Sequence, residues 1–196
     1  QELMSLLGDP QQAYPVIHIT GTNGKGSTTC VMESLLQAMG LRVGTYTSPH
    51  LESVVERIRL GGESISADAF GEAIGTVLTA IEASGREHMT WFETVTAAAL
   101  LEFANEAVDV AIVEVGMLGR YDATNVVSAQ VAVVTNIGLD HSSGEGEWRR
   151  AIASEKAGII EPASPLVLGE LDESLHPIFL HEGPARAVFR GEGFDL

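Results

Sequence analysis

The chain alternates short runs of apolar residues with stretches in which apolar positions recur at helical spacing. The apolar runs predict buried strands at residues 15–20, 42–47, 109–115, 131–137 and 165–169, with a last short strand at 185–190. The helical spacing predicts helices at residues 27–39, 67–84, 90–105, 147–157 and 172–182. Because continuous apolar strands alternate with helices, we expect an α/β fold, a mostly parallel sheet with helices on both faces.

Residues near the ends of these segments sharpen the boundaries. A short first helix is expected to stop at Gly8 and Pro10. Ser66 has the side chain of a good N-cap for the helix that follows it, and Thr90 and Glu93 have capping-box spacing.

Two predictions concern the core. The apolar side chains of the helix at 27–39 share one face, which is typical of a helix packed on a sheet: Val31, Met32, Leu35, Leu36 and Met39. His18 and Cys30 lie in or beside apolar runs, and we expect both to pack in the core.

Composition excludes several classes of function. The 196 residues carry 27 acidic and 11 basic side chains, a net charge of −16, which argues against a nucleic-acid partner and against an anionic membrane surface. No apolar stretch approaches the length of a membrane span. Cys30 is the only cysteine, so a disulfide framework and a cysteine-rich zinc site are excluded, and a reducing, cytoplasmic setting is expected. No linker is visible, and we expect one domain over residues 1–196.

The strongest local signal is VIHITGTNGKGSTT, in which a strand runs into a glycine-rich turn and then a helix. Gly21, Gly24 and Gly26 permit close approach of the backbone to a phosphate, and the helix N-terminus adds N–H donors. The segment departs from the Walker pattern, because Ile19 holds the first glycine position and Gly26 follows the lysine. An ordinary glycine-rich turn is the alternative.

The same turn carries side chains suited to phosphate. Lys25 supplies a positive charge for the outer phosphates, while Ser27 and Thr28 offer hydroxyl groups to phosphate or Mg²⁺. Together they indicate a phosphate-binding site in an α/β fold of the P-loop type.

Polar residues follow three of the other predicted strands. Ser48 follows the second strand, Glu114 ends DVAIVE, and Asp140 and His141 follow VAVVTNIGL. Because parallel strands expose their carboxyl ends together, these residues are expected at the same edge as the glycine-rich turn at residues 21–28, called the phosphate loop below. Ser48, Glu114 and His141 could then complete a Mg²⁺ shell, although histidine is an unusual Mg²⁺ ligand. The alternative is that Glu114 is a solvated strand end and His141 a loop residue.

Seven motifs occur in order between about Ala13 and Pro162: GTNGKGS, TSPHL, ERIR, TWFE, EVGMLGRYDATN, IGLDH and SEKAGII. This set resembles the folylpolyglutamate synthases, including the bacterial bifunctional dihydrofolate synthases, within the Mur ligase superfamily. The resemblance implies a ligase that activates a carboxylate of folate or dihydropteroate as an acyl phosphate, using ATP. The amine of L-glutamate then attacks, and an amide forms with release of ADP and phosphate.

The resemblance also implies roles for individual residues. The ATP-binding loop is the run Gly21, Thr22, Asn23, Gly24, Lys25, Gly26, Ser27 and Thr28. The Mg²⁺ positions are Ser48, Glu114 and His141. Lys156 matches a lysine that is carbamylated in relatives and helps to hold a second Mg²⁺, and Lys25, His141 and Lys156 are the expected catalytic residues. The segments that contact the pteroate end are Thr90, Trp91, Phe92 and Glu93, and Tyr121, Asp122 and Ala123.

Each of these side chains has a purely structural alternative. Lys156 is also a helix-end lysine suited to the helix dipole, and Glu93 is also the third residue of a capping box. Asp122 and Thr124 could be turn formers. Trp91 and Tyr121 could stack on a pterin ring, but Trp91 could equally pack in the core.

The chain departs from the family pattern at three places. Leu118-Gly119 replaces the usual glycine pair, and residues 142–146 replace an acidic-aromatic run. The resemblance also implies a C-terminal Rossmann-like domain that binds glutamate and completes the ATP site, and we expect that residues 1–196 do not include it. Two rivals stay open: a cell-wall Mur ligase, and a nucleotide-binding module without ligase activity. The motifs TSPHL, ERIR and TWFE favour folate.

Overall fold

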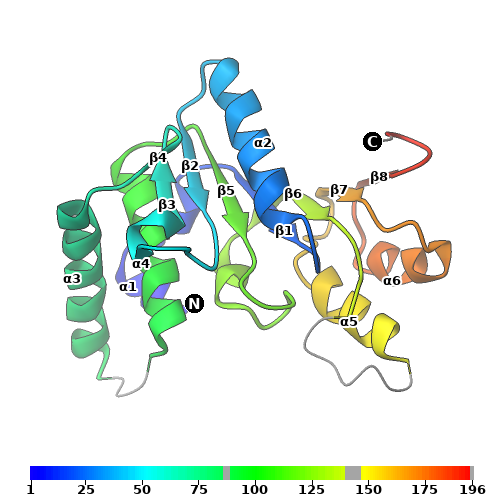
Figure 1. Ribbon diagram of the computed structural model, residues 1–196. Helices are drawn as coiled ribbons and strands as arrows, with labels where there is room; N and C mark the ends of the chain where they lie inside the picture. Colours follow the sequence, from blue (N-terminus) through cyan, green and yellow to red (C-terminus); the bar gives the residue numbers. More distant parts are fainter. Residues whose placement is uncertain (86–88, 140–146, 195–196) are drawn as a thin grey trace.

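The computed structural model describes residues 1–85, 89–139 and 147–194. Its strands form one sheet in the order β4-β3-β2-β5-β1-β6-β7-β8 (Figure 1). The neighbouring strands in the series β2-β5-β1-β6-β7-β8 pair in parallel. At the β2 edge, β3 pairs antiparallel with β2 and β4 pairs antiparallel with β3. The strands are β1 (Val16–Thr20), β2 (Val43–Tyr46), β3 (Ile58–Leu60), β4 (Glu63–Ser64), β5 (Val110–Glu114), β6 (Ala129–Val134), β7 (Pro165–Leu168) and β8 (Arg186–Phe189).

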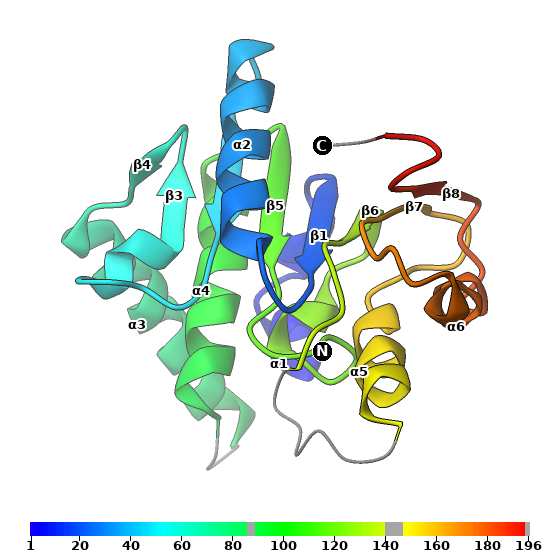
Figure 2. The same ribbon diagram turned by 45° about the vertical axis from the view of Figure 1, so that its right-hand side comes forward.

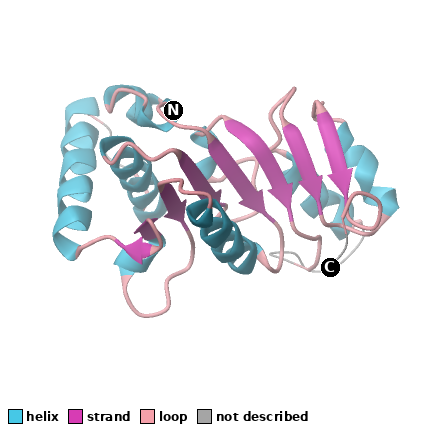
Figure 3. Ribbon diagram, turned by 90° about the horizontal axis from the view of Figure 1, so that it is seen from above, coloured by secondary structure: helices cyan, strands magenta, loops and turns pink. Residues whose placement is uncertain are grey.

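Helices cover both faces of this sheet (Figure 3). The α-helices are α1 (Glu2–Leu6), α2 (Lys25–Ala38), α3 (Ala67–Ser84), α4 (Trp91–Asn105), α5 (Trp148–Ala157) and α6 (His176–Leu180). The short 3-10 helices are η1 (Pro10–Gln12), η2 (Val54–Arg57), η3 (Ala123–Val126) and η4 (Glu173–Leu175). No helix within the described ranges combines the length and the apolar character that crossing a membrane requires.

The alternation of side chains along each strand divides the core between the faces. On β5, Val110 and Ile112 join the cluster under α2, whereas Ala111 and Val113 join the cluster of α3 and α4. On β6, Ala132 and Val134 pack with α5 and α6 instead. Figures 1 and 2 show α2 and α4 on opposite sides of the sheet accordingly.

The predicted fold class is confirmed, with differences at the ends of elements. The helix at 27–39 begins two residues earlier, at Lys25, because Gly24 adopts φ +82° and turns the chain into the helix. The segment at 172–182 is divided into η4 and α6 rather than forming one helix. The hairpin strand β4 was not predicted, because two exposed residues carry no alternating pattern.

The predicted apolar face of α2 is partly wrong. Met32 and Leu36 pack against the sheet, but Val31, Leu35 and Met39 are exposed, and Thr29 and Glu33 are buried in their place. Glu33 is buried because it accepts a hydrogen bond from Thr45 Oγ1 (2.7 Å) and forms an ion pair with Arg59 (2.7 Å).

Of the two residues expected in the core, His18 is fully buried, as predicted. Cys30 is exposed, so that prediction is wrong. Cys30 lies one turn before Ser34 on the exposed side of α2, where its carbonyl accepts from the Ser34 hydroxyl (2.9 Å).

Candidate functional site

The carboxyl ends of β1, β2, β5 and β6 meet at one edge of the sheet, because these strands are parallel and in register. The loops that follow them contain the phosphate motif, Ser48, Glu114 and residues 135–138. Asp140 and His141 lie outside the described residues.

The phosphate loop is held in a conformation that requires glycine. Gly21 has φ +147°, and a Cβ there would stand 1.8 Å from Thr135 Oγ1. The first turn of α2 follows directly, and its N-cap, Gly24, offers no side chain to its backbone N–H groups. Ser27 is exposed and Thr28 is half-buried in this turn. The N-terminus of α2 is therefore open to an anion.

Thr22 and Asn23 fix the loop to the segment after β6. Thr22 N–H donates to the Asn136 carbonyl (3.1 Å), and Thr22 Oγ1 accepts from Gly138 N–H (2.9 Å). Asn23 N–H donates to Asn136 Oδ1 (2.9 Å). Lys25 Nζ donates to the Gly21 carbonyl (2.9 Å), so its ammonium group lies over the loop.

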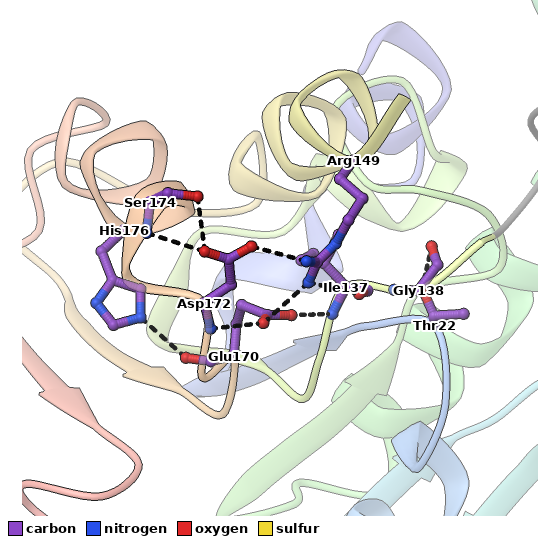
Figure 4. Close-up of polar contacts among 8 residues, drawn as sticks. All are labelled: Thr22, Ile137, Gly138, Arg149, Glu170, Asp172, Ser174 and His176. Carbon is purple, nitrogen blue, oxygen red and sulfur yellow. Dashed lines mark hydrogen bonds and ion pairs between the residues drawn. The ribbon is translucent and has the colours of Figure 1, made fainter. Parts of the chain in front are cut away.

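An acidic network supports the same segment from the other side (Figure 4). The buried carboxylate of Glu170 accepts from Ile137 N–H (2.7 Å) and pairs with Arg149 of α5 (3.1 Å). Arg149 also pairs with Asp172 (2.7 Å), whose pKa is lowered by hydrogen bonds from Ser174. Sequence analysis missed this network; the acid directly after the strand at 165–169 was its one signal.

Glu114 and Ser48 lie beside the phosphate loop. Glu114 is the last residue of β5 and is 4% exposed, so it is not a solvated strand end. Ser48 N–H donates to Glu114 Oε2 at 3.4 Å, and that oxygen lies 3.9 Å from the position of a Cβ on Gly26. Burial raises the pKa of Glu114, while the Lys25 charge and the Ser48 N–H lower it.

These residues fit a magnesium ion bound together with phosphate. In the part of the chain that the structure describes, no three His, Cys, Asp or Glu side chains gather to hold a metal alone. Mg²⁺ is commonly held by one or two carboxylates together with phosphate oxygens and water. Glu114 supplies such a carboxylate, and the Ser48 hydroxyl is a second oxygen of the type that Mg²⁺ prefers.

A cavity of about 760 Å³ adjoins this edge. The residues predicted from the sequence that line it are Ser48, Thr90, Phe92, Glu93, Tyr121, Asp122 and Ala123. Arg57 of η2 lines it too, although sequence analysis gave it no role. Trp91 does not line the cavity; it is 53% exposed, so core packing is wrong for it. Its ring lies 4.7 Å from the Arg57 guanidinium.

Glu93 and Asp122 line the cavity, and each also has the structural role that was its alternative. Glu93 forms the predicted capping box, accepting from Thr90 N–H (2.8 Å). Asp122 caps η3 and also accepts from Met117 N–H (2.8 Å). Tyr121 directly precedes Asp122 in the chain and is 86% exposed.

The loop between β5 and η3 shows the effect of the unusual Leu118. Leu118 adopts φ +58°, a left-handed conformation in which a glycine is unstrained. Its carbonyl accepts from Thr20 Oγ1 at the end of β1 (2.5 Å). Gly119 follows where a Cβ would stand 3.3 Å from the Cα of Lys156. Lys156 itself is 1% exposed, which a solvated helix-end lysine would not be.

Residues 19–179 match the family described as the Mur ligase middle domain. The chain belongs to this family. The resemblance read from the seven motifs is also confirmed. The chain is 47% identical over 171 residues to a dihydrofolate synthase/folylpolyglutamate synthase of Mycobacterium tuberculosis, covering 82% of this chain and 35% of the relative. It is 43% identical over 164 residues to the Escherichia coli enzyme of the same name, covering 84% and 38%.

Solved structures of folylpolyglutamate synthases have the same fold as this chain. The Mycobacterium tuberculosis folylpolyglutamate synthase complexed with ADP matches with a TM-score of 0.90 and 40% identity, covering 96% of this chain and 45% of that one. A bifunctional folylpolyglutamate synthase/dihydrofolate synthase with Mn, AMPPNP and L-glutamate bound matches with a TM-score of 0.89 and 37% identity, covering 97% and 46%. The chain therefore spans less than half the length of these relatives.

Proposed function

We propose that this chain is the ATP-binding part of a ligase that joins L-glutamate to folate or dihydropteroate. One observation carries the proposal: Ser48 both lines the large cavity and contacts Glu114 beside the phosphate loop. A substrate carboxylate in the cavity would therefore lie next to the γ-phosphate of ATP on that loop. Relatives named for this ligation, some of them with ADP or AMPPNP bound, support the same conclusion.

The residues of the edge suit transfer of a phosphoryl group. The open N-terminus of α2 and Lys25 would bind the phosphates of ATP, and Glu114, Ser48 and His141 would hold Mg²⁺. Bound Mg²⁺ supplies charge neutralisation on the phosphates. As the resemblance implies, the γ-phosphoryl group passes to the substrate carboxylate and ADP leaves. The amine of L-glutamate then attacks the acyl carbon, an amide bond forms, and phosphate is released.

Lys156 belongs to the same proposal. A neutral lysine amine that adds CO₂ and releases one proton becomes an anionic carbamate, which would suit a second Mg²⁺. The buried position of Lys156 behind the Leu118–Gly119 loop is consistent with such a role. The pteroate end of the substrate would contact the cavity segments at 90–93 and 121–123.

The rest of the reaction is assigned to protein beyond this chain. This chain covers less than half of each of the two solved relatives, and one of them was solved with L-glutamate bound. We propose that a further C-terminal domain supplies the glutamate site and completes the ATP site. A cytoplasmic location, expected from the single cysteine, belongs to this proposal as well.

A ligation assay of the full-length protein that contains this chain tests the proposal. Dihydropteroate, folate and a nucleotide-sugar peptide are offered in turn, with ATP and labelled L-glutamate. We expect one ADP for each glutamate joined to dihydropteroate or folate, and no product with the nucleotide-sugar peptide. Product only with the peptide would identify a cell-wall ligase, and no product with any acceptor would identify a nucleotide-binding module.

A further inference from the structure

His18 is a buried polar residue for which the proposed chemistry has no use. It lies in β1, three residues before Gly21 of the phosphate loop, and is 0% exposed. Its Nε2 lies 2.9 Å from Thr124 Oγ1 of η3, and its Nδ1 has no hydrogen-bond partner among the described residues. An apolar side chain would fill this space without burying an unsatisfied nitrogen, so stability alone does not explain a histidine here.

The hydrogen atoms of this cluster can be assigned from its acceptors. Thr124 Oγ1 donates to Asp122 Oδ1 at 2.5 Å, because an ionised carboxylate only accepts. The threonine hydroxyl has one hydrogen, so it must accept from His18. His18 is therefore the Nε2–H tautomer and a donor. Burial also lowers the pKa of His18 to about 3, which keeps the ring neutral at physiological pH.

The chain of hydrogen bonds ends in the wall of the cavity. Asp122 Oδ1 also accepts from Thr124 N–H (3.0 Å), and Asp122 Oδ2 accepts from Met117 N–H (2.8 Å). Met117 and Asp122 both line the cavity. The strand that leads into the phosphate loop is thus joined to the wall of the cavity by three side chains in series, those of His18, Thr124 and Asp122.

We propose that His18 is a positioning residue for the cavity: through Thr124 it orients the Asp122 carboxylate and so fixes residues 117–122 against the pteridine end of the substrate. This inference rests on the proposed function for its substrate. The series of hydrogen bonds from His18 through Thr124 to Asp122, here called the relay, does not depend on that function and can be measured separately.

Three variants separate positioning from packing. His18→Gln places an amide N–H₂ near the position of Nε2 and keeps the donor. His18→Met fills a similar volume without a donor. Thr124→Val keeps the shape of threonine and removes the hydroxyl. If the relay is real, His18→Met and Thr124→Val have the same effect on Met117 exchange and on KM for dihydropteroate. The double variant that combines them is no worse than Thr124→Val, and His18→Gln behaves nearly as the wild type does.

The first measurement is amide hydrogen exchange in this 196-residue chain. Because Met117 N–H donates to Asp122, we expect it to exchange about tenfold faster in His18→Met and Thr124→Val than in the wild type. In His18→Gln it should remain protected. The Val115 N–H, which donates to the Ile19 carbonyl of β1 (2.9 Å), is the internal control and should not change.

The second measurement is steady-state kinetics of the full-length protein. We expect His18→Met and Thr124→Val to raise KM for dihydropteroate about tenfold with KM for ATP unchanged, and His18→Gln to restore most of the difference. Unchanged Met117 exchange in His18→Met would overturn the relay, and equal changes in both KM values would reduce His18 to a packing residue. If the wild type shows no ligation while Met117 exchange responds as expected, the relay stands and the proposed function fails.

Discussion

Glu114 is a buried carboxylate beside the positively charged Lys25. It ends an apolar strand, so sequence alone placed it at the correct edge of the sheet. Sequence could not tell a solvated strand end from a buried carboxylate, because the groups that enclose it, Ser48 and the Gly26 turn, come from distant segments. Burial raises the pKa of Glu114, and the nearby Lys25 charge and Ser48 N–H act in the opposite direction.

Glu114→Gln keeps the shape of this side chain and removes its charge. In the full-length protein we expect the Mg²⁺-dependent ligation rate to fall about 100-fold, because a hard cation loses its charged ligand. The fold should survive, since the change removes a buried charge. Glu33→Gln is the matched control, because Glu33 is also a buried glutamate but lies in the middle of α2, where it pairs with Arg59 of β3. The ligation rate of this control should not fall in the same way. Full activity in Glu114→Gln would contradict the assignment.

His18 predicts a pH dependence of stability. Its pKa is about 3 in the folded chain and 6.5 when unperturbed, so below pH 6.5 the unfolded chain binds a proton that the folded chain does not. This favours unfolding as the pH falls, by about 1.4 kcal/mol for each pH unit between 6.5 and 3.

Urea unfolding of the chain at pH 4 to 6.5 measures this effect. The free energy of unfolding of the wild type should fall more steeply with decreasing pH than that of His18→Gln, which does not titrate. Parallel slopes for the two proteins would show that His18 is protonated in the folded state.

At the scale of elements, sequence patterns predicted strands and helices well but could not choose helix faces. In α2, apolar spacing favoured Val31 and Leu35, yet Glu33 is buried because its partner Arg59 arrives from β3. Spacing within one helix contains no information about such a partner. Arg57 and Glu170 were missed for the same reason, since each acts through contacts with segments remote in sequence.

The packing of α4 on β2 depends on a glycine. A Cβ on Gly44 would stand 2.7 Å from the buried ring of Phe103, so Gly44→Ala should lower the free energy of unfolding by about 1–3 kcal/mol. Gly75→Ala is the control, because a Cβ there meets nothing within 4 Å on α3. That variant should stabilise by about 0.5–1 kcal/mol. Equal effects of both variants in urea unfolding would refute the close approach.

At the scale of the whole molecule, the glycine-rich loop, Ser48, Glu114 and the cavity lie at one edge of the sheet, but the chain spans less than half of its solved relatives. Ligation requires the acyl phosphate and the amine to be held together. We therefore expect residues 1–196 alone to incorporate no labelled glutamate, while the full-length protein does so under the same conditions. Robust incorporation by the isolated chain would mean that a complete glutamate site lies within it.

Calorimetric titration of the 196-residue chain with Mg·ATP tests the central claim most directly, because the phosphate loop underlies every later step. We expect weak, saturable binding by the wild type and a loss of at least about tenfold in Lys25→Ala. Arg42→Ala is the control: it removes one positive charge at the opposite edge of the sheet, where Arg42 pairs with Glu106. It should bind as the wild type does. Equal binding by the wild type and Lys25→Ala would contradict the account.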